Sequence, residues 1–140
     1  PYTPGMDVDA IADDLRRLLR EEPSPPVCAW LFGSVARGDD HAGSDVDVAV
    51  LFRERLPATL DGCGFAIAGR LEAALQRPVD LIVINGKPAD LVHRVLRDGR
   101  LLLDDEPSAR VRFEVTARRE YFDVLPYLRE YRGLPPHPRP

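Results

Sequence analysis

The sequence is poor in lysine, cysteine and long apolar runs, and each shortage excludes a class of protein. Lys87 is the single lysine among 19 cationic residues, and a net charge of −4 argues against a protein that coats nucleic acid. Cys28 and Cys63 form no CxxC pair and have no His at metal-ligand spacing, so we expect reduced cysteines packed in or near the core. Since no apolar run approaches the roughly 20 residues of a membrane-spanning helix, we expect a cytoplasmic protein without a membrane partner.

The length fits one domain with one active site, because 140 residues suffice for a single hydrophobic core. We expect this domain to occupy residues 6–132. Residues 133–140 are rich in proline and are predicted to form a flexible tail.

Periodic apolar residues alternate with proline and glycine breaks along the domain. They predict helices at 6–22, 59–76, 88–99 and 107–132, and strands at 27–32, 44–52 and 78–86. Residues 33–38 are expected to form a turn leading from a strand to a helix, and residues 100–105 either an edge strand or a packed connector. Pro126 is expected to kink or split the last helix, because it cannot donate a backbone hydrogen bond.

Two aspartates begin the predicted strand at 44–52. Side chains alternate along a strand, so Asp45 and Asp47 share a face with Ala49 and Leu51. Both faces are apolar further along, which indicates that the strand is covered on both sides and that the aspartates lie where a cleft begins. Their charges would repel by roughly 3 kcal/mol at about 6 Å, so a bound cation would stabilise them.

A further carboxylate stands in the next predicted strand. Asp80 is the one charged residue in VDLIVI, and it shares a face with Ile82 and Ile84. Three carboxylates on adjacent strands suit Mg²⁺, which prefers a few carboxylates together with phosphate oxygens. Two such ions can hold the attacking and leaving oxygens of a phosphoryl transfer.

The turn after the first strand suits a phosphate group. Gly33 allows the backbone to approach an anion closely, Ser34 adds a hydroxyl donor, and Arg37 adds a positive charge. Each feature alone has a simpler interpretation: an ordinary turn, solvated aspartates at a strand end, a surface arginine, or an ion-pair partner at Asp80. Their order along the chain favours a metal and phosphate site.

The segment GSVARG, followed after five residues by SDVDVAV, resembles the signature of minimal nucleotidyltransferases. These proteins belong to the polymerase-beta-like nucleotidyltransferase superfamily, and VDLIVI stands where the family carries its third carboxylate. The chain length and the long last helix resemble the MntA-type antitoxins, which pair with HEPN-domain toxins.

The resemblance implies an α+β fold, in which helices flank a small mixed sheet with the site at its open end. It implies that Asp45, Asp47 and Asp80 are catalytic and bind two Mg²⁺ ions. Nucleotide binding would fall to Gly33, Ser34, Arg37 and Ser44. Family members transfer AMP from ATP to a hydroxyl, and MntA-type proteins place it on a tyrosine of the toxin. We therefore expect a protein adenylyltransferase that acts as an antitoxin and assembles with a HEPN toxin.

Two alternative functions stay open at this point. The same motif occurs in enzymes that adenylylate small molecules or RNA ends, although this chain has neither a second domain nor a strongly basic track. A non-catalytic antitoxin that neutralises its toxin by contact is the other alternative. The intact motif positions argue against it.

Overall fold

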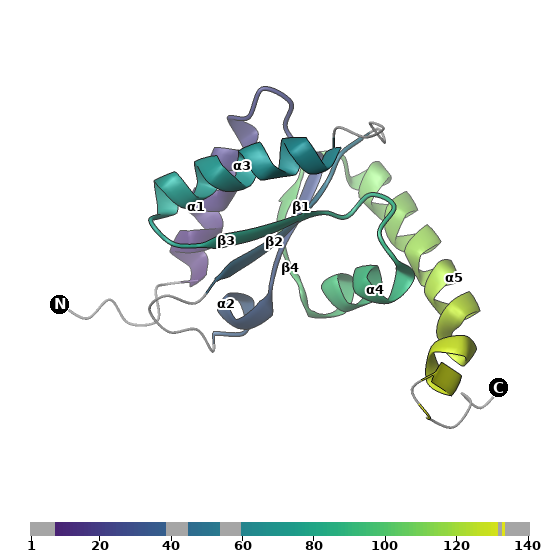
Figure 1. Ribbon diagram of the computed structural model, residues 1–140. Coiled ribbons are helices and arrows are strands. Elements are labelled where there is room, and N and C mark those ends of the chain that lie inside the picture. Colours follow the sequence, from purple (N-terminus) through teal and green to yellow (C-terminus); the bar gives the residue numbers. More distant parts are fainter. Residues whose placement is uncertain (1–7, 39–44, 54–59, 132, 134–140) are drawn as a thin grey trace.

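The strands of the chain form one sheet with helices on both faces (Figure 1). The computed structural model describes residues 8–38, 45–53, 60–131 and 133. The elements are α1 (Val8–Arg20), β1 (Cys28–Phe32), α2 (Gly33–Arg37), β2 (Val46–Leu51), α3 (Leu60–Leu75), β3 (Val79–Val83), α4 (Ala89–Asp98), β4 (Arg100–Asp104) and α5 (Pro107–Tyr131). Every predicted helix and strand is present within a few residues of its expected bounds.

The sheet is mixed, with strand order β3-β2-β1-β4. β1 pairs antiparallel with both β2 and β4, whereas β2 and β3 run parallel and are joined through α3. A parallel pair needs such a crossover, because a tight turn can connect only antiparallel strands. The α+β class and the small mixed sheet are therefore confirmed, and residues 100–105 provide an edge strand.

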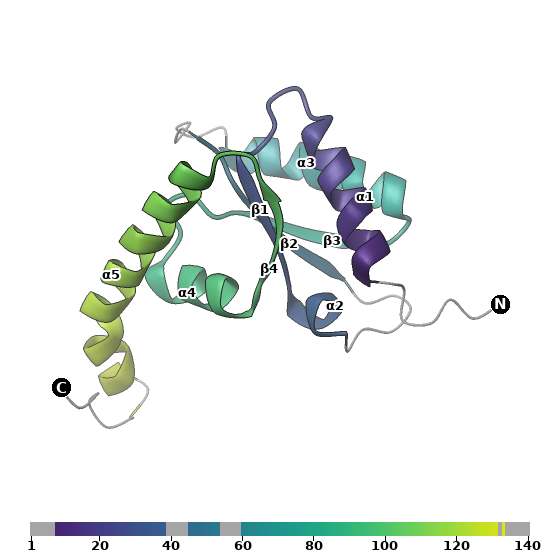
Figure 2. The same cartoon turned by 180° about the vertical axis from the view of Figure 1, so that it is seen from behind.

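Each face of the sheet packs on its own pair of helices. α1 and α3 cover one face, and α4 and α5 cover the other (Figures 1 and 2). Val46, Val48 and Val50 of β2 point into the first core, and Ala49 and Leu51 point into the second. This confirms the prediction that β2 is covered on both sides, and it places Asp47 on the α4 and α5 face.

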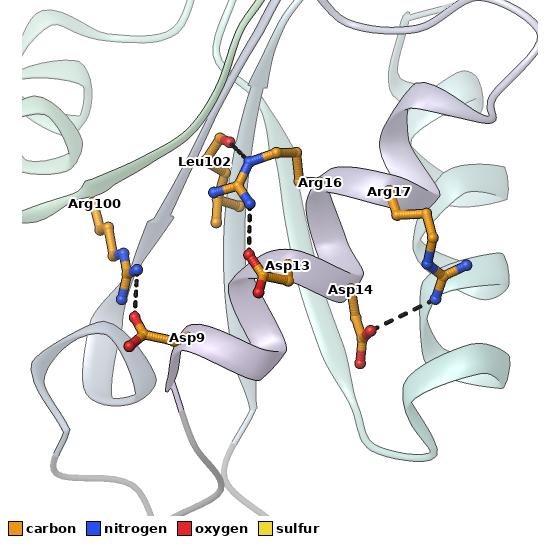
Figure 3. Close-up of polar contacts among 7 residues, drawn as sticks. All are labelled: Asp9, Asp13, Asp14, Arg16, Arg17, Arg100 and Leu102. Carbon is orange, nitrogen blue, oxygen red and sulfur yellow. Dashed lines mark hydrogen bonds and ion pairs between the residues drawn. The ribbon is translucent and has the colours of Figure 1, made fainter.

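The outer strand β4 contains a bulge, and a side chain of α1 forms a hydrogen bond with its unpaired carbonyl. The register with β1 shifts between Ala29 and Trp30, which leaves Leu102 without a partner in the ladder. Arg16 of α1 donates its Nε–H to the Leu102 carbonyl at 2.6 Å, and Arg100 of β4 pairs with Asp9 of α1 (Figure 3). The bulged carbonyl is therefore satisfied by a side chain rather than by a strand.

Helix α5 runs unbroken past Pro126, so of the expected kink or split, the split does not occur. Proline at this position removes one backbone hydrogen bond near the end of the helix, where the remaining turns keep the helix intact. Several large apolar side chains of α5 stay exposed, namely Val111, Val115, Phe122, Tyr127 and Tyr131. The helix contributes to the core chiefly through Ala117 and Phe113.

Cys28 is fully buried, as expected for a reduced cysteine in the core. Burial, and then the charge of Asp104, raise the pKa of the Cys28 thiol to about 12. The side chain of Cys63 lies outside the described residues. Among the helices that the structure describes, none is both long enough and apolar enough to cross a membrane.

Candidate active site

Asp47 lies at the centre of the candidate site, where β1 ends and β2 and β3 begin. In the sheet it pairs with Phe32, the last residue of β1, on one side and with Asp80 of β3 on the other. Residues that pair across neighbouring strands point to the same face, so the Asp47 and Asp80 carboxylates lie together on the α4 and α5 face. Asp45 stands directly before β2 and is exposed.

The Gly33 backbone lies against the Asp47 carboxylate. Gly33 has a φ of 75°, and a β-carbon at this position would lie 2.1 Å from Asp47 Oδ2. Glycine therefore meets two requirements here, a left-handed backbone and a contact that leaves no room for a side chain. The turn directs the chain from β1 straight into α2, so the expected turn is itself the start of a short helix.

The electrostatics of Asp47 show that the three aspartates interact. Burial raises the pKa of Asp47 above its ordinary value, and the negative charges of Asp80 and Asp45 raise it further. Arg37 opposes this increase. Asp47 and Asp80 thus lie side by side in the sheet, and Asp45 and Arg37 are near enough to act on Asp47 electrostatically.

The carboxylates do not form a closed metal cluster. Within the described parts of the chain, no three His, Cys, Asp or Glu side chains are close enough together to hold a metal ion. The donor set nevertheless fits Mg²⁺, because it consists of carboxylate oxygens whose mutual repulsion a divalent cation would relieve. An open arrangement also suits Mg²⁺, which keeps several waters and phosphate oxygens among its ligands.

The predicted nucleotide-binding residues lie on the β1 side of Asp47. Ser34 is half-buried in the first turn of α2, and Arg37 is exposed at its last residue. Ser44 lies outside the described residues. Trp30, in the middle of β1, is buried in the second core.

A groove on the β3 side of Asp47 was not predicted. It has a volume of about 460 Å³ and is lined by Phe65, Ala68 and Glu72 of α3, by all five residues of β3 and by Lys87. We refer to it as the α3–β3 groove. Phe65 lies within the helix predicted at 59–76 from its apolar spacing, yet its side chain is 85% exposed. The apolar spacing in the sequence could not distinguish a groove wall from a core residue.

Comparison with known proteins agrees with this geometry. The family model for polymerase beta nucleotidyltransferases matches residues 13–108, which is more than half of the chain. The chain belongs to this nucleotidyltransferase family. The match includes the Gly33 turn and all three aspartates.

One curated relative is the protein adenylyltransferase MntA of Shewanella oneidensis. It is 33% identical to this chain over 87 residues, which cover 61% of this chain and 60% of the relative. The matched region therefore spans less than two thirds of that protein.

Solved structures of toxin–antitoxin complexes have the same fold. A chain in a toxin–antitoxin crystal structure with AMP-PNP is 26% identical and superposes with a TM-score of 0.70, covering 86% of this chain and 93% of that chain. A chain in the structure of a tri-AMPylated Shewanella oneidensis HEPN toxin with an MNT antitoxin is 23% identical. Its TM-score is 0.67, it covers 89% of this chain and 94% of that chain, and it supports the fold alone.

Proposed function

We propose that this nucleotidyltransferase is an antitoxin that transfers AMP from ATP to a tyrosine hydroxyl of a partner HEPN toxin, with Mg²⁺ as cofactor. The observation that carries the proposal is the position of the Asp47 carboxylate. It touches the Gly33 turn on one side and pairs with Asp80 on the other. A nucleotide and an acceptor hydroxyl could thus meet at one carboxylate cluster.

The nucleotide would lie on the Gly33 side of the cluster. The Ser34 hydroxyl and the Arg37 guanidinium would bind phosphate oxygens, and Ser44 is proposed to add a further donor. The crystal structure of a toxin–antitoxin relative with AMP-PNP supports ATP as the substrate. Because Gly33 has no side chain, the triphosphate could lie against the backbone of this turn next to Asp47.

Asp45, Asp47 and Asp80 would hold two Mg²⁺ ions. When bound, these ions supply charge neutralisation for the carboxylates and for the phosphate oxygens. The raised pKa of Asp47, caused by burial and by the neighbouring carboxylates, indicates a cluster that favours added positive charge. The three side chains would also fix the position of the α-phosphate relative to the acceptor.

The transfer step is a displacement at the α-phosphorus. The acceptor oxygen forms a new bond to phosphorus, the bond to the oxygen bridging the α- and β-phosphates breaks, and pyrophosphate leaves with that electron pair. Asp80 stands on the acceptor side and would take the hydroxyl proton or help to orient the hydroxyl. Positioning and charge neutralisation supply most of the rate enhancement in such reactions.

The substitution Asp47→Asn tests this function. We expect a folded protein whose AMP transfer to the HEPN partner falls by about a hundredfold or more, since changes around a metal centre commonly cost that much. Transfer would be measured with labelled ATP, Mg²⁺ and the purified partner. Asp14→Asn is the matched control, because Asp14 is exposed on α1 and pairs with Arg17.

Transfer by Asp47→Asn at the rate of the Asp14→Asn control would contradict the assignment. The same assay separates catalysis from neutralisation by contact when toxin activity is measured alongside. Neutralisation that survives Asp45→Asn would indicate an antitoxin that acts by binding. Transfer to a small alcohol or an RNA end instead of the partner would identify the other alternative.

A further inference from the structure

We propose that the α3–β3 groove binds the acceptor segment of the partner protein as an extended strand along the free edge of β3. This inference rests on the proposed function and names the surface that presents the hydroxyl. The groove is a binding site of stated chemistry: it takes a short peptide that carries the acceptor side chain.

Among the residues that the structure describes, none forms a backbone–backbone hydrogen bond with the outer edge of β3. In the parallel ladder Pro78 accepts from Val46 at 2.9 Å and Ile84 donates to Val50 at 2.8 Å. Backbone groups alternate in direction along a strand, so those of Leu81 and Val83 point away from β2. The outward N–H of Val79 donates to Glu72 Oε1 at 2.9 Å, which shows where the edge faces. A strand entering the groove would meet the outward backbone groups of Leu81 and Val83.

The groove borders the candidate site at one residue, Asp80. Asp80 lines the groove and also pairs with Asp47 in the sheet. The Gly33 turn lies on the opposite side of Asp47, next to β1. Nucleotide and acceptor would therefore approach the carboxylates from opposite sides of β2, as a displacement at phosphorus requires.

The chemistry of the walls favours a peptide over a triphosphate. Phe65 and Leu81 give the groove apolar surface, and an exposed aromatic side chain commonly anchors a protein ligand. Glu72 places a carboxylate in the lining that is not among the proposed metal ligands, and it would repel phosphates. Strand addition at a sheet edge is an established mode of peptide recognition.

The substitution Ala68→Trp tests the proposal by filling the groove. Ala68 lines the groove, whereas Ala74 lies on the same helix and does not, so Ala74→Trp is the matched control. We expect Ala68→Trp to raise the KM for the HEPN partner about tenfold or more, as loss of a central contact does. Affinity for an ATP analogue with Mg²⁺ should stay within about twofold of wild type for both variants.

A second variant and a direct probe keep the test independent of folding defects. Phe65→Ala removes an exposed side chain and should also raise the KM for the partner. In wild-type protein with an ATP analogue, adding the partner should slow hydrogen exchange at the Leu81 and Val83 amides, because they would donate to the bound strand.

Each remaining outcome is decisive. If Ala68→Trp weakened the affinity for the ATP analogue by the same factor as it raised the KM for the partner, the groove would be a nucleotide subsite. This result would overturn the proposal. Unchanged KM in both groove variants would also overturn it. So would hydrogen exchange at the Leu81 and Val83 amides that the partner does not slow in the presence of the ATP analogue. Wild-type protein that transfers no AMP to the partner would contradict the proposed function and this inference together.

Discussion

At the scale of single residues, Gly33 connects the backbone to the chemistry of the site. Its left-handed conformation turns the chain out of β1, and its missing side chain leaves the space that the Asp47 carboxylate occupies. A larger residue would have to displace that carboxylate. Gly38 provides a comparison, because it has the same φ of 75° and no described residue apart from its chain neighbours lies within 4 Å of where its β-carbon would be.

We expect Gly33→Ala to abolish AMP transfer and Gly38→Ala to retain most of it. Both substitutions place a side chain in the left-handed region, which costs about 1 kcal/mol each. The substitution at Gly33 alone would push a β-carbon into the Asp47 carboxylate. Urea denaturation measures the loss of stability that both variants share. The transfer assay measures the difference in AMP transfer between them.

Transfer at the wild-type rate in both variants would show that the contact between Gly33 and Asp47 has no catalytic consequence. Equal losses of transfer would point to the backbone strain instead. Comparing the two glycines thus separates conformation from the space next to the carboxylate.

At the scale of elements, the contact between α1 and β4 makes a stability prediction. Arg16 satisfies the bulged carbonyl of Leu102, a residue that is 2% exposed, so Arg16→Ala would leave a buried acceptor without a partner. We expect the free energy of unfolding to fall by about 1–3 kcal/mol, as for other hydrogen bonds to charged groups. Urea denaturation followed by circular dichroism measures it.

Arg17→Ala is the control for this prediction, since Arg17 is exposed and pairs with Asp14 (Figure 3). Arg17 also pairs with Glu21 one turn further along α1. Exposed pairs contribute little, so we expect a change below about 0.5 kcal/mol. Equal effects at Arg16 and Arg17 would mean that the contact with Leu102 does not stabilise the sheet.

The sequence allowed the elements to be predicted because their cores impose strong periodicity. The alternation in β2 identified the face shared by Asp45 and Asp47, and the isolated charge in VDLIVI identified Asp80 as its neighbour across the sheet. The family motif located the Gly33 turn. Local pattern was sufficient wherever a residue faces a core or a turn.

Some tertiary features could not be predicted, because apolar spacing in the sequence does not show whether a side chain packs in the core or lines a groove. Phe65 follows helical spacing but is exposed at the α3–β3 groove. The bulge at Leu102 depends on the register between β1 and β4, which the sequence alone does not specify. The groove itself depends on β3 being the last strand of the sheet.

At the scale of the whole molecule, the two cores share one sheet. β1 and β2 contribute side chains to both, so neither pair of helices can lose its core without exposing the strands that the other pair covers. We therefore expect the described domain to unfold as one cooperative unit.

Trp30 allows this expectation to be measured. It is 3% exposed and lies 6.2 Å from Phe113 of α5 between ring centroids. Its fluorescence reports the α4 and α5 core, while far-ultraviolet circular dichroism reports all helices. The two unfolding curves in urea should coincide. A fluorescence change at lower urea than the dichroism change would show that α4 and α5 detach first.

The two borders of the sheet differ in their capacity to recruit another chain. At β4 the bulge and the guanidinium of Arg16 interrupt the row of backbone groups, whereas β3 keeps outward groups at Leu81 and Val83. Growth of a fibre by strand pairing needs two open sheet edges on every molecule. The described part of this protein has one such edge, at β3. The protein can thus leave one strand edge available for recognition without becoming a link in an endless polymer.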